Sequence, residues 1–572
     1  MASQSLISDV QGRRWPALAA LAVATTAAFA RSVSSPLLDS WDDRRFLVEF
    51  EPVRHVSLAS LRAIWTEEHF QAFHPMHLMS YWLDVPWVGP NGPVLHAVNL
   101  VLWIIALGLV LEVFERLGLP RWAALLGTLL YGLHPAQVEA VCWATGRKEI
   151  LALGFSCGAV LLHLRSARAL DRAAWGSRLL FVLAALSKTT VLPLPMLLFL
   201  IDVLLRGVSA KQALLRQVPT LLIAAGLGAV VVAIWRGAEM IRPDTAGEEA
   251  TGSAGLVMAT FTHHLGTALW PAATSPVYPI HRGGAFPAAA WLGPSALVLG
   301  SVAAWRLGAR RALFAAAGFT VMLMPVSNVI PVYFQVQDRY LSLPLLPLAF
   351  GAGAAIAHGS AYASAHGRSA LRWAPHALAI AAVVALGLRT SQYSLAWSSD
   401  ARLWRHAVSA HPDAFYAWMK LGEIRRDRGD FAGAIRAYRR AIAVSPDLRL
   451  GHAALFHAVA LRDERRRGIR PTGAMELARR YHAGLDRTDA LRDLASELLG
   501  LGYRDATLLA LGRSLDLAPV ADERLERAAA IQLEQGNAWL ARYYLTRMGR
   551  PPLPPRLRLL LSSPGTEAGA SP

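Results

Sequence analysis

The stretch VLHAVNLVLWIIALGLVLEVF, residues 94–114, determines how the rest of the sequence is interpreted. Its only charged residue is Glu112, and most of the others are aliphatic. A helix needs about 20 mostly apolar residues to cross the hydrocarbon core of a bilayer. Residues 94–114 therefore predict a membrane-spanning helix.

Similar apolar stretches occur on both sides of this one. Hydrophobic residues make up 54% of the chain and charged residues 17%, where a soluble domain has roughly 25% charged residues. The pattern predicts an all-α, polytopic helix bundle with about eleven spans. Besides 94–114, the predicted spans are approximately 15–31, 120–134, 149–165, 177–187, 189–205, 217–235, 290–306, 311–326, 341–358 and 373–390. We interpret 177–205 as a hairpin broken near Lys188 and Pro193, and 15–31 as an uncleaved first span rather than a signal peptide.

The basic residues give the orientation of these spans. The net charge is +17, and alternate connections are basic, as the positive-inside rule predicts for cytoplasmic loops. This placement explains the charge without a nucleic-acid partner. The basic connections carry Arg116 and Arg121; Arg165, Arg168, Arg172 and Arg178; Arg206, Lys211 and Arg216; Arg306, Arg310 and Arg311; and Arg368 and Arg372. The predicted outer segments are 32–93, 135–148, the turn 187–189, 236–289, 327–340 and everything after 390.

The chain becomes amphipathic after residue 390. Residues 415–448 match a tetratricopeptide (TPR) repeat, a 34-residue unit of two helices. The matching residues are Trp418, Leu421, Gly422, Gly429, Phe431, Ala434, Tyr438, Ala441 and Pro446. Weaker echoes follow at Gly502-Tyr503 and Gly536. We predict a membrane domain over 1–390, a TPR-type helical solenoid over 391–561 and a disordered tail over 562–572.

Polar, motif-like segments gather on the predicted outer side, which suggests a site at the membrane surface. They are Trp41-Asp42-Asp43, Phe73-His74-Pro75, His134-Pro135 with Glu139 and Arg147-Lys148-Glu149, Ser187-Lys188, and Gln337-Asp338-Arg339-Tyr340. The alternative is that these residues only cap helix ends. His74 and His77 lie three apart with His69 nearby, but Pro75 interrupts a regular helix and no trio of zinc ligands emerges. We predict no resident metal or cofactor, although a divalent metal requirement stays open.

These segments resemble the transmembrane and tetratricopeptide-repeat-containing protein family. The similarity rests on Trp41-Asp42-Asp43, on HPAQVEAVCWATGRKE at 134–149, on Leu186-Ser187-Lys188, on Pro325-Val326-Ser327-Asn328 and on Asp338-Arg339-Tyr340. The family is related to protein O-mannosyltransferases of the glycosyltransferase-C fold, which use polyprenyl-phosphate sugars. His74 departs from the pattern, because animal members typically have Arg before the Pro.

Sugar transfer from a lipid phosphate needs a base for the acceptor hydroxyl and fixed positive charge for the departing phosphate. Asp42 and Asp43 are the candidate bases. The resemblance favours Asp42, whereas the chemistry of the residues alone does not choose between them. Arg147, Lys148 and Arg339 are the candidate phosphate-binding residues. The remaining polar residues are candidates for binding substrate: His74, His134, Glu139, Asp338 and Lys188.

The leading hypothesis is an integral membrane glycosyltransferase, in a bacterial inner membrane, with its repeat domain on the periplasmic side. It would move a sugar, by resemblance mannose, from a polyprenyl phosphate to Ser or Thr of an exported polypeptide held in the repeat groove. Two alternatives remain: transfer to a lipid or glycan, and a non-enzymatic scaffold for envelope complexes. A transporter is disfavoured, because the ionisable residues lie at span ends and not near the membrane midplane.

Overall fold

The computed structural model describes residues 14–67, 69, 73–237, 254–279, 287–330, 334–366, 373–467 and 473–548. Arg368, Arg372 and the predicted tail over 562–572 lie outside these residues. Within them the chain forms helices and no β-strand, which confirms the all-α prediction. The chain divides into two compact units, Met1–Ala417 and Trp418–Pro572. Residues 391–417, predicted from the sequence to begin the repeat domain, thus belong to the first unit.

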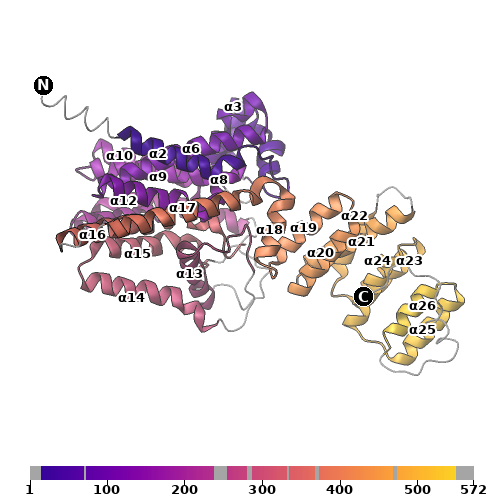
Figure 1. The fold of residues 1–572 in the computed structure, drawn as a ribbon. Helices are drawn as coiled ribbons and strands as arrows, with labels where there is room; N and C mark the ends of the chain where they lie inside the picture. Colours follow the sequence, from indigo (N-terminus) through magenta and orange to yellow (C-terminus); the bar gives the residue numbers. More distant parts are fainter. Residues whose placement is uncertain are drawn as a thin grey trace. The chain divides into compact units, whose positions relative to one another are not determined.

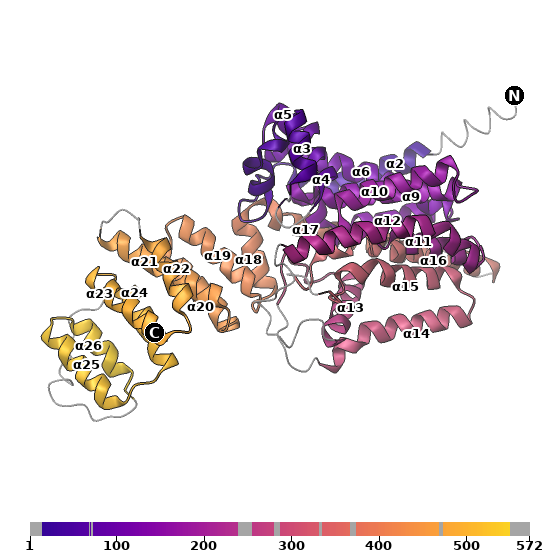
Figure 2. The same cartoon turned by 180° about the vertical axis from the view of Figure 1, so that it is seen from behind.

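The first unit is a bundle of long helices that run side by side, with the short helices α3, α4 and α5 gathered at one end (Figures 1 and 2). Its helices are α2 (Arg14–Phe29), α3 (Leu58–Thr66), α4 (Pro75–Ser80), α5 (Val85–Val88), α6 (Gly92–Arg116), α7 (Arg121–Gly132), α8 (Val138–Cys142), α9 (Arg147–Arg165), α10 (Arg172–Ser187), α11 (Leu194–Leu200), α12 (Ala210–Gly237), α13 (Ala254–Leu269), α14 (Leu292–Arg306), α15 (Arg310–Leu323), α16 (Leu345–Ala365), α17 (Ala374–Ser394) and α18 (Asp400–Ala410).

Each predicted span coincides with helical structure, but the helices differ in length. Among the described residues, four stretches are long and apolar enough to cross a membrane: Gly92–Arg116, Ala210–Ile234, Ala288–Arg306 and Ala374–Ser398. Their side chains support the same interpretation, because Leu222 of α12, Leu299 of α14 and Leu388 of α17 are exposed. A bilayer would cover such apolar faces. The count of about eleven spans stays a prediction.

Local sequence explains where the principal helices begin and end. The Asn91 side chain accepts a hydrogen bond from the Val94 backbone N at 3.3 Å and caps the start of α6. Asp171 caps α10 in the same way, with 2.7 Å to the Ala174 backbone N. Gly118 ends the α6 segment with a φ of 89°, a conformation that costs a glycine little.

Two of the predicted outer segments contain ordered structure. The outer loop 32–93 has its own small core of Phe46, Leu47, Val53, Ile64, Leu78, Tyr81 and Val85, completed by Leu95 and Ala144. The predicted outer segment 236–289 contains α13. Phe261 of α13 packs with Phe319 and Leu323 of α15, which holds this helix against the bundle.

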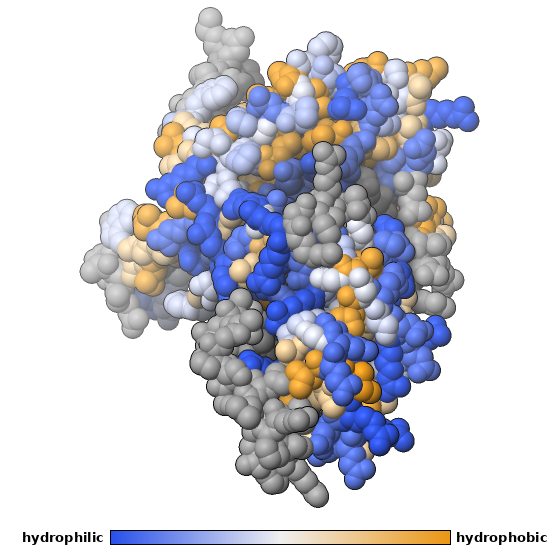
Figure 3. All heavy atoms as spheres, turned by 90° about the vertical axis from the view of Figure 1, so that its right-hand side faces the viewer, coloured by the Kyte–Doolittle hydropathy of each residue, from blue (hydrophilic) through white to orange (hydrophobic). Residues whose placement is uncertain are grey.

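The second unit continues from α19 (Phe415–Asp427), which crosses the boundary, as antiparallel helical hairpins. Its other helices are α20 (Phe431–Val444), α21 (Arg449–Arg467), α22 (Ala474–Gly484), α23 (Thr488–Gly500), α24 (Arg504–Leu517), α25 (Asp522–Glu534) and α26 (Ala538–Thr546). Gly429, Gly502 and Gly536 occupy the same place in three hairpin turns, each with φ between 75° and 79°. In Figure 3, which draws the whole chain, hydrophilic side chains occupy much of the coloured surface, with apolar patches between them.

Close packing in the first hairpin explains its small residues. A Cβ added to Gly422 would lie 2.4 Å from the ring of Tyr438, which is fully buried. Ala434 and Ala441 are also completely buried. Only small residues allow α19 and α20 to approach this closely. This packing fits the repeat that the sequence predicts over 415–448.

Candidate functional site

The turn before Asp42 is held by a helix from far along the chain. The carboxylate of Asp400, at the start of α18, accepts hydrogen bonds from the backbone N of Ser40, at 3.0 Å, and from its hydroxyl. The indole Nε1 of Trp404 donates to the Ser40 hydroxyl at 2.6 Å. The rings of Trp404 and Trp41 meet edge to face, with centroids 5.3 Å apart. Helix α18 therefore fixes the start of the outer loop.

Asp43 is fully buried and links this loop to the segment before α9. Its Oδ1 accepts hydrogen bonds from the backbone N and the hydroxyl of Thr145, both at 3.0 Å, and its Oδ2 accepts one from the Leu38 backbone N at 3.0 Å. Burial raises the pKa of Asp43 to about 6, although these hydrogen bonds oppose the shift. Both carboxylate oxygens of Asp43 are thus used inside the fold.

Asp42 has the opposite environment. Its side chain is half-buried, and it makes no hydrogen bond or ion pair with any other residue that the structure describes. It lies close enough to Lys148 to affect the titration of that amine. Burial, assisted by the Arg339 charge, lowers the pKa of Lys148 to about 8, and Asp42 opposes this shift. Of the two adjacent carboxylates, Asp42 is the one available to a ligand.

Trp143 brings three outer segments together. The ring of Trp41 lies 5.8 Å from the Trp143 ring. The Nζ of Lys148 lies 4.7 Å from the Trp143 ring centroid, and the Arg339 Cζ lies 5.4 Å from it. Cations bind aromatic faces at such distances. Trp143 was not among the predicted site residues, although an aromatic residue inside the motif at 134–149 was a visible clue.

Two ion pairs surround this group. Glu139 is fully buried; its carboxylate binds the Arg339 guanidinium and also accepts from the Arg339 backbone N at 3.3 Å. Glu149 is also buried, and its carboxylate binds the Nζ of Lys188. Glu139 and Glu149 thus each have a cation, which offsets the cost of removing the charges from water. Arg339 keeps 13% of its side chain exposed, so it can still meet a ligand.

Arg147 has a different environment from the one its motif suggested. Its side chain has no exposed surface, and its guanidinium binds the Asp84 carboxylate. The Nε also donates to the Asn99 Oδ1 at 2.7 Å, and one Nη donates to the Ser80 carbonyl at 3.1 Å. The guanidinium lies 4.4 Å above the Tyr81 ring. Arg147 is used to hold the outer loop against α9, so we leave it out of the phosphate-binding group.

His74 lies at the start of α4, half-buried, and no hydrogen bond of its ring to another described residue is present. Burial, together with the charges of Lys148 and Lys188, lowers the pKa of His74 to about 3. The ring is therefore neutral near pH 7, and it can donate or accept a hydrogen bond without adding charge.

His134 and Asp338 are used within the fold. The Nδ1 of His134 accepts from the Ala136 backbone N at 3.2 Å, and its Nε2 lies 3.3 Å from the Ala268 carbonyl of α13. The Asp338 carboxylate accepts from the Tyr278 hydroxyl, from the Ser275 backbone N at 2.9 Å and from the Tyr393 hydroxyl at 3.4 Å. Both residues position the loops that carry Glu139 and Arg339. Among the described residues, no three His, Cys, Asp or Glu side chains could hold a metal ion together.

No protein-family model matches this chain, and no curated protein matches it. Among solved structures, it is similar to the oligosaccharyltransferase of Archaeoglobus fulgidus, solved with a tethered acceptor peptide containing the NVT sequon. The identity is 14% and the TM-score 0.39; the match covers 74% of this chain and 58% of that enzyme, less than two thirds of its length. A likeness at this level assigns neither a family nor an activity.

Proposed function

We propose that this protein is an integral membrane glycosyltransferase of the glycosyltransferase-C kind. It would move a sugar, with mannose as the first candidate, from a polyprenyl phosphate to Ser or Thr of an exported polypeptide on the outer face of a bacterial inner membrane. One observation carries the proposal: the Asp42 carboxylate, which makes no hydrogen bond or ion pair with another described residue, acts electrostatically on Lys148, and Lys148 shares the Trp143 ring with Arg339.

The reaction uses each of these groups. Asp42 takes the proton of the acceptor hydroxyl, whose oxygen then forms a bond to the anomeric carbon of the sugar. The bond between that carbon and the phosphate oxygen breaks, and the lipid phosphate leaves with the electron pair. Lys148 and Arg339 stabilise the negative charge that develops on the phosphate. With a pKa of about 8, Lys148 is mostly protonated near pH 7.

The other predicted residues have supporting roles in this proposal. Neutral His74 offers a hydrogen bond to a sugar hydroxyl. Lys188, paired with Glu149, contributes positive charge at the edge of the group. Glu139 orients Arg339. No resident cofactor is part of this scheme; the lipid-linked sugar is a substrate.

We further propose that the second unit is a TPR-type array that binds the acceptor polypeptide. The matching glycines at Gly429, Gly502 and Gly536 and the close contact of Gly422 with Tyr438 support repeated helical hairpins. Stacked hairpins of this type form concave surfaces that suit an extended peptide. An array of this kind would also suit the alternative role of a scaffold, so the transferase test must separate the two.

The test compares exported proteins from cells that carry the normal chain, no chain, Asp42→Asn, or the matched control Asp39→Asn from the same loop. Asp39 is exposed, so its substitution leaves the cluster intact. Intact-mass analysis should show hexose increments with the normal chain and Asp39→Asn. They should be absent without the chain, and Asp42→Asn should lower the transfer rate by roughly 10²–10⁴-fold.

Other outcomes would overturn parts of the proposal. Increments that persist with Asp42→Asn but vanish without the chain would remove Asp42 as the base and favour the scaffold. If exported proteins are the same in all four strains, the acceptor is not a protein. Purified chain, incubated with polyprenyl-phosphate mannose and either a Ser/Thr peptide or extracted lipid, would then distinguish lipid from peptide acceptors.

A further inference from the structure

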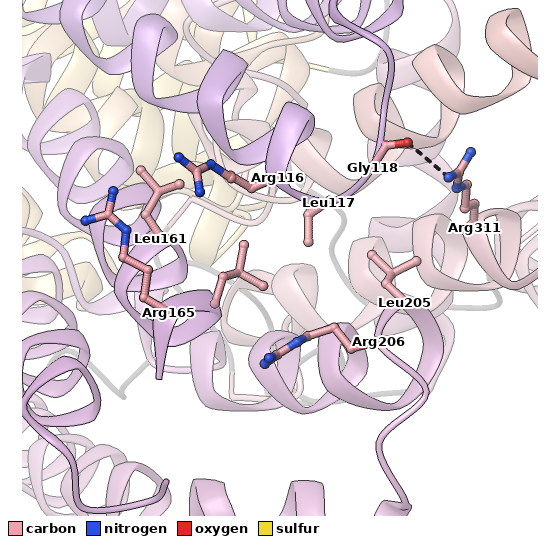
Figure 4. A pocket seen from close by; sticks show the side chains of 9 residues that line it. Arg116, Leu117, Gly118, Leu161, Arg165, Leu205, Arg206 and Arg311 are labelled. Atoms are coloured by element: carbon pink, nitrogen blue, oxygen red, sulfur yellow. Dashed lines mark hydrogen bonds between the residues drawn. The ribbon is translucent and has the colours of Figure 1, made fainter. Parts of the chain in front are cut away.

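A second group of charges lies at the C-terminal end of α9, the helix that carries Lys148 near its N-terminal end. A cavity of about 500 Å³ is lined by Arg116, Leu117, Gly118, Leu161, Leu164, Arg165, Leu205, Arg206 and Arg311. Figure 4 shows the arginine side chains placed around a centre formed by leucines, with Arg116 and Arg165 on one side and Arg311 on the other. Four arginines thus surround a partly apolar cavity.

These arginines come from four elements. Arg116 lies in the last turn of α6, Arg165 ends α9, and Arg206 follows the π-helical turn Ile201–Leu205. Arg311 lies in the first turn of α15. All four belong to connections that the positive-inside rule predicts to be cytoplasmic. The cavity therefore lies at the end of the bundle where the inner leaflet would place its head groups.

Helix dipoles explain only part of this arrangement. Cations are favoured at helix C-termini, where Arg116 and Arg165 lie. Arg311 instead lies at a helix N-terminus, where a positive charge is disfavoured. A dipole effect also gives no reason for four guanidinium groups to converge on one cavity.

The residues that line the cavity include no carboxylate. Arg116 binds Glu112 at 2.8 Å, and Arg206 binds Asp202 at 2.8 Å, but both carboxylates lie outside the lining. The buried Asp202 also meets His163 at 3.1 Å and Arg216 at 3.6 Å, so its charge is shared.

Two of the four guanidinium groups meet no carboxylate among the residues that the structure describes. Arg311 donates to the Gly118 carbonyl at 3.1 Å and meets no carboxylate among the described residues. No hydrogen bond or ion pair joins the Arg165 side chain to another residue that the structure describes. The cavity therefore has an excess of positive charge that the described fold does not neutralise.

We propose that this cavity binds the phosphate-bearing head group of an anionic phospholipid from the surrounding bilayer. Guanidinium groups bind phosphate oxygens through paired hydrogen bonds, and basic pockets between membrane helices on the cytoplasmic side are suited to such head groups. Leu117, Leu161, Leu164 and Leu205 are partly exposed in the cavity lining. They offer apolar contact to the glycerol and upper acyl carbons, which a free phosphate ion could not use.

The experiment measures binding of phosphatidylglycerol to the full chain in detergent by native mass spectrometry. Phosphatidylcholine and inorganic phosphate serve as comparison ligands. The variants are Arg165→Gln and the double variant Arg165→Gln/Arg311→Gln. The control is Arg168→Gln, an exposed arginine of the same predicted face that does not line the cavity. Phosphatidylglycerol should bind the normal chain and the control equally, the single variant several-fold more weakly and the double variant at least tenfold more weakly.

Two results would overturn the proposal. Equal weakening by Arg168→Gln would show a diffuse charge effect and not a site. Displacement of the lipid by millimolar inorganic phosphate would show a free-anion site instead. Arg165→Lys keeps the charge and should retain more lipid binding than Arg165→Gln. As a control for folding, both variants should unfold at the same temperature as the normal chain in the absence of lipid. The outcome is independent of the proposed transferase activity, because no cavity residue belongs to the cluster around Trp143.

Discussion

The two ends of α9 carry positive charge in different ways. At its N-terminal end, the Arg147 guanidinium is completely buried against Asp84, and Lys148 lies over Trp143. At its C-terminal end, Arg165 is exposed beside a cavity lined without a carboxylate. Lys148 and Arg165 are separated by about 26 Å, since an α-helix rises about 1.5 Å per residue.

This difference shows which charges build the fold and which remain for a ligand. A buried ion is stable only with a partner, because its removal from water costs several kcal/mol. Arg147, Glu139 and Glu149 follow this rule. An exposed arginine keeps its hydration and stays free to meet an anion. Asp42 is similar to Arg165, because its side chain also has no hydrogen bond or ion pair among the described residues. It acts electrostatically on Lys148, however, which lies at the N-terminal end of α9 where most charges are buried.

The greatest loss of stability is expected when the buried cation at the N-terminal end of α9 is removed. Arg147→Gln leaves the Asp84 carboxylate buried without its cation, which should lower the free energy of unfolding by about 3–5 kcal/mol. Arg165→Gln, the same change at the other end of the helix, should alter it by less than about 0.5 kcal/mol. Denaturant unfolding of both purified variants in detergent measures this. Similar losses in the two variants would show that pairing does not distinguish the two ends.

The next prediction compares the stability of variants at two neighbouring carboxylates, Asp43 and Asp42. Asp43→Asn places an amide donor against the Leu38 backbone N or against the donors of Thr145, so a buried hydrogen bond is lost. The free energy of unfolding should fall by about 1–3 kcal/mol. Asp42→Asn should leave stability within about 0.5 kcal/mol of normal. If Asp42→Asn proves the more destabilising variant, Asp42 is the structural carboxylate and the assignment of the base reverses.

Much of this arrangement could be predicted from the sequence. Apolar length and basic loops indicated the helical stretches, and turn residues at fixed offsets indicated the first hairpin. The outer motifs were expected to meet, and Trp41, Lys148 and Arg339, each from a different motif, do lie around the Trp143 ring.

Burial and partners of single side chains could not be predicted. Arg147 and Lys148 are adjacent and basic, and only the fold shows that Asp84, distant in sequence, takes the guanidinium of the first. Asp42 and Asp43 are equivalent until Thr145 and Leu38 are placed around one of them. The role of α18 was missed for a similar reason, because the contact between Asp400 and Ser40 joins residues with no common pattern.

A smaller change in stability is expected when the pH rises, and it arises from the buried Asp338. Burial raises the pKa of Asp338 from 3.8 to about 8, with Glu139 adding to the shift and the Tyr278 and Tyr393 hydroxyls opposing it. The folded protein therefore binds more protons than the unfolded chain between these values, and its stability falls as pH rises. This contribution should fall by about 1 kcal/mol between pH 7 and pH 8 and change little at higher pH.

The comparison with Asp338→Asn isolates this contribution, because the amide cannot titrate. The difference in unfolding free energy between the normal chain and the variant should therefore change by about 1 kcal/mol from pH 7 to pH 8. Arginine stays charged throughout this range, so binding of phosphatidylglycerol at the other end of the bundle should stay constant. If the affinity for phosphatidylglycerol falls between pH 7 and pH 8 in the normal chain but not in Asp338→Asn, the two ends of the bundle are coupled.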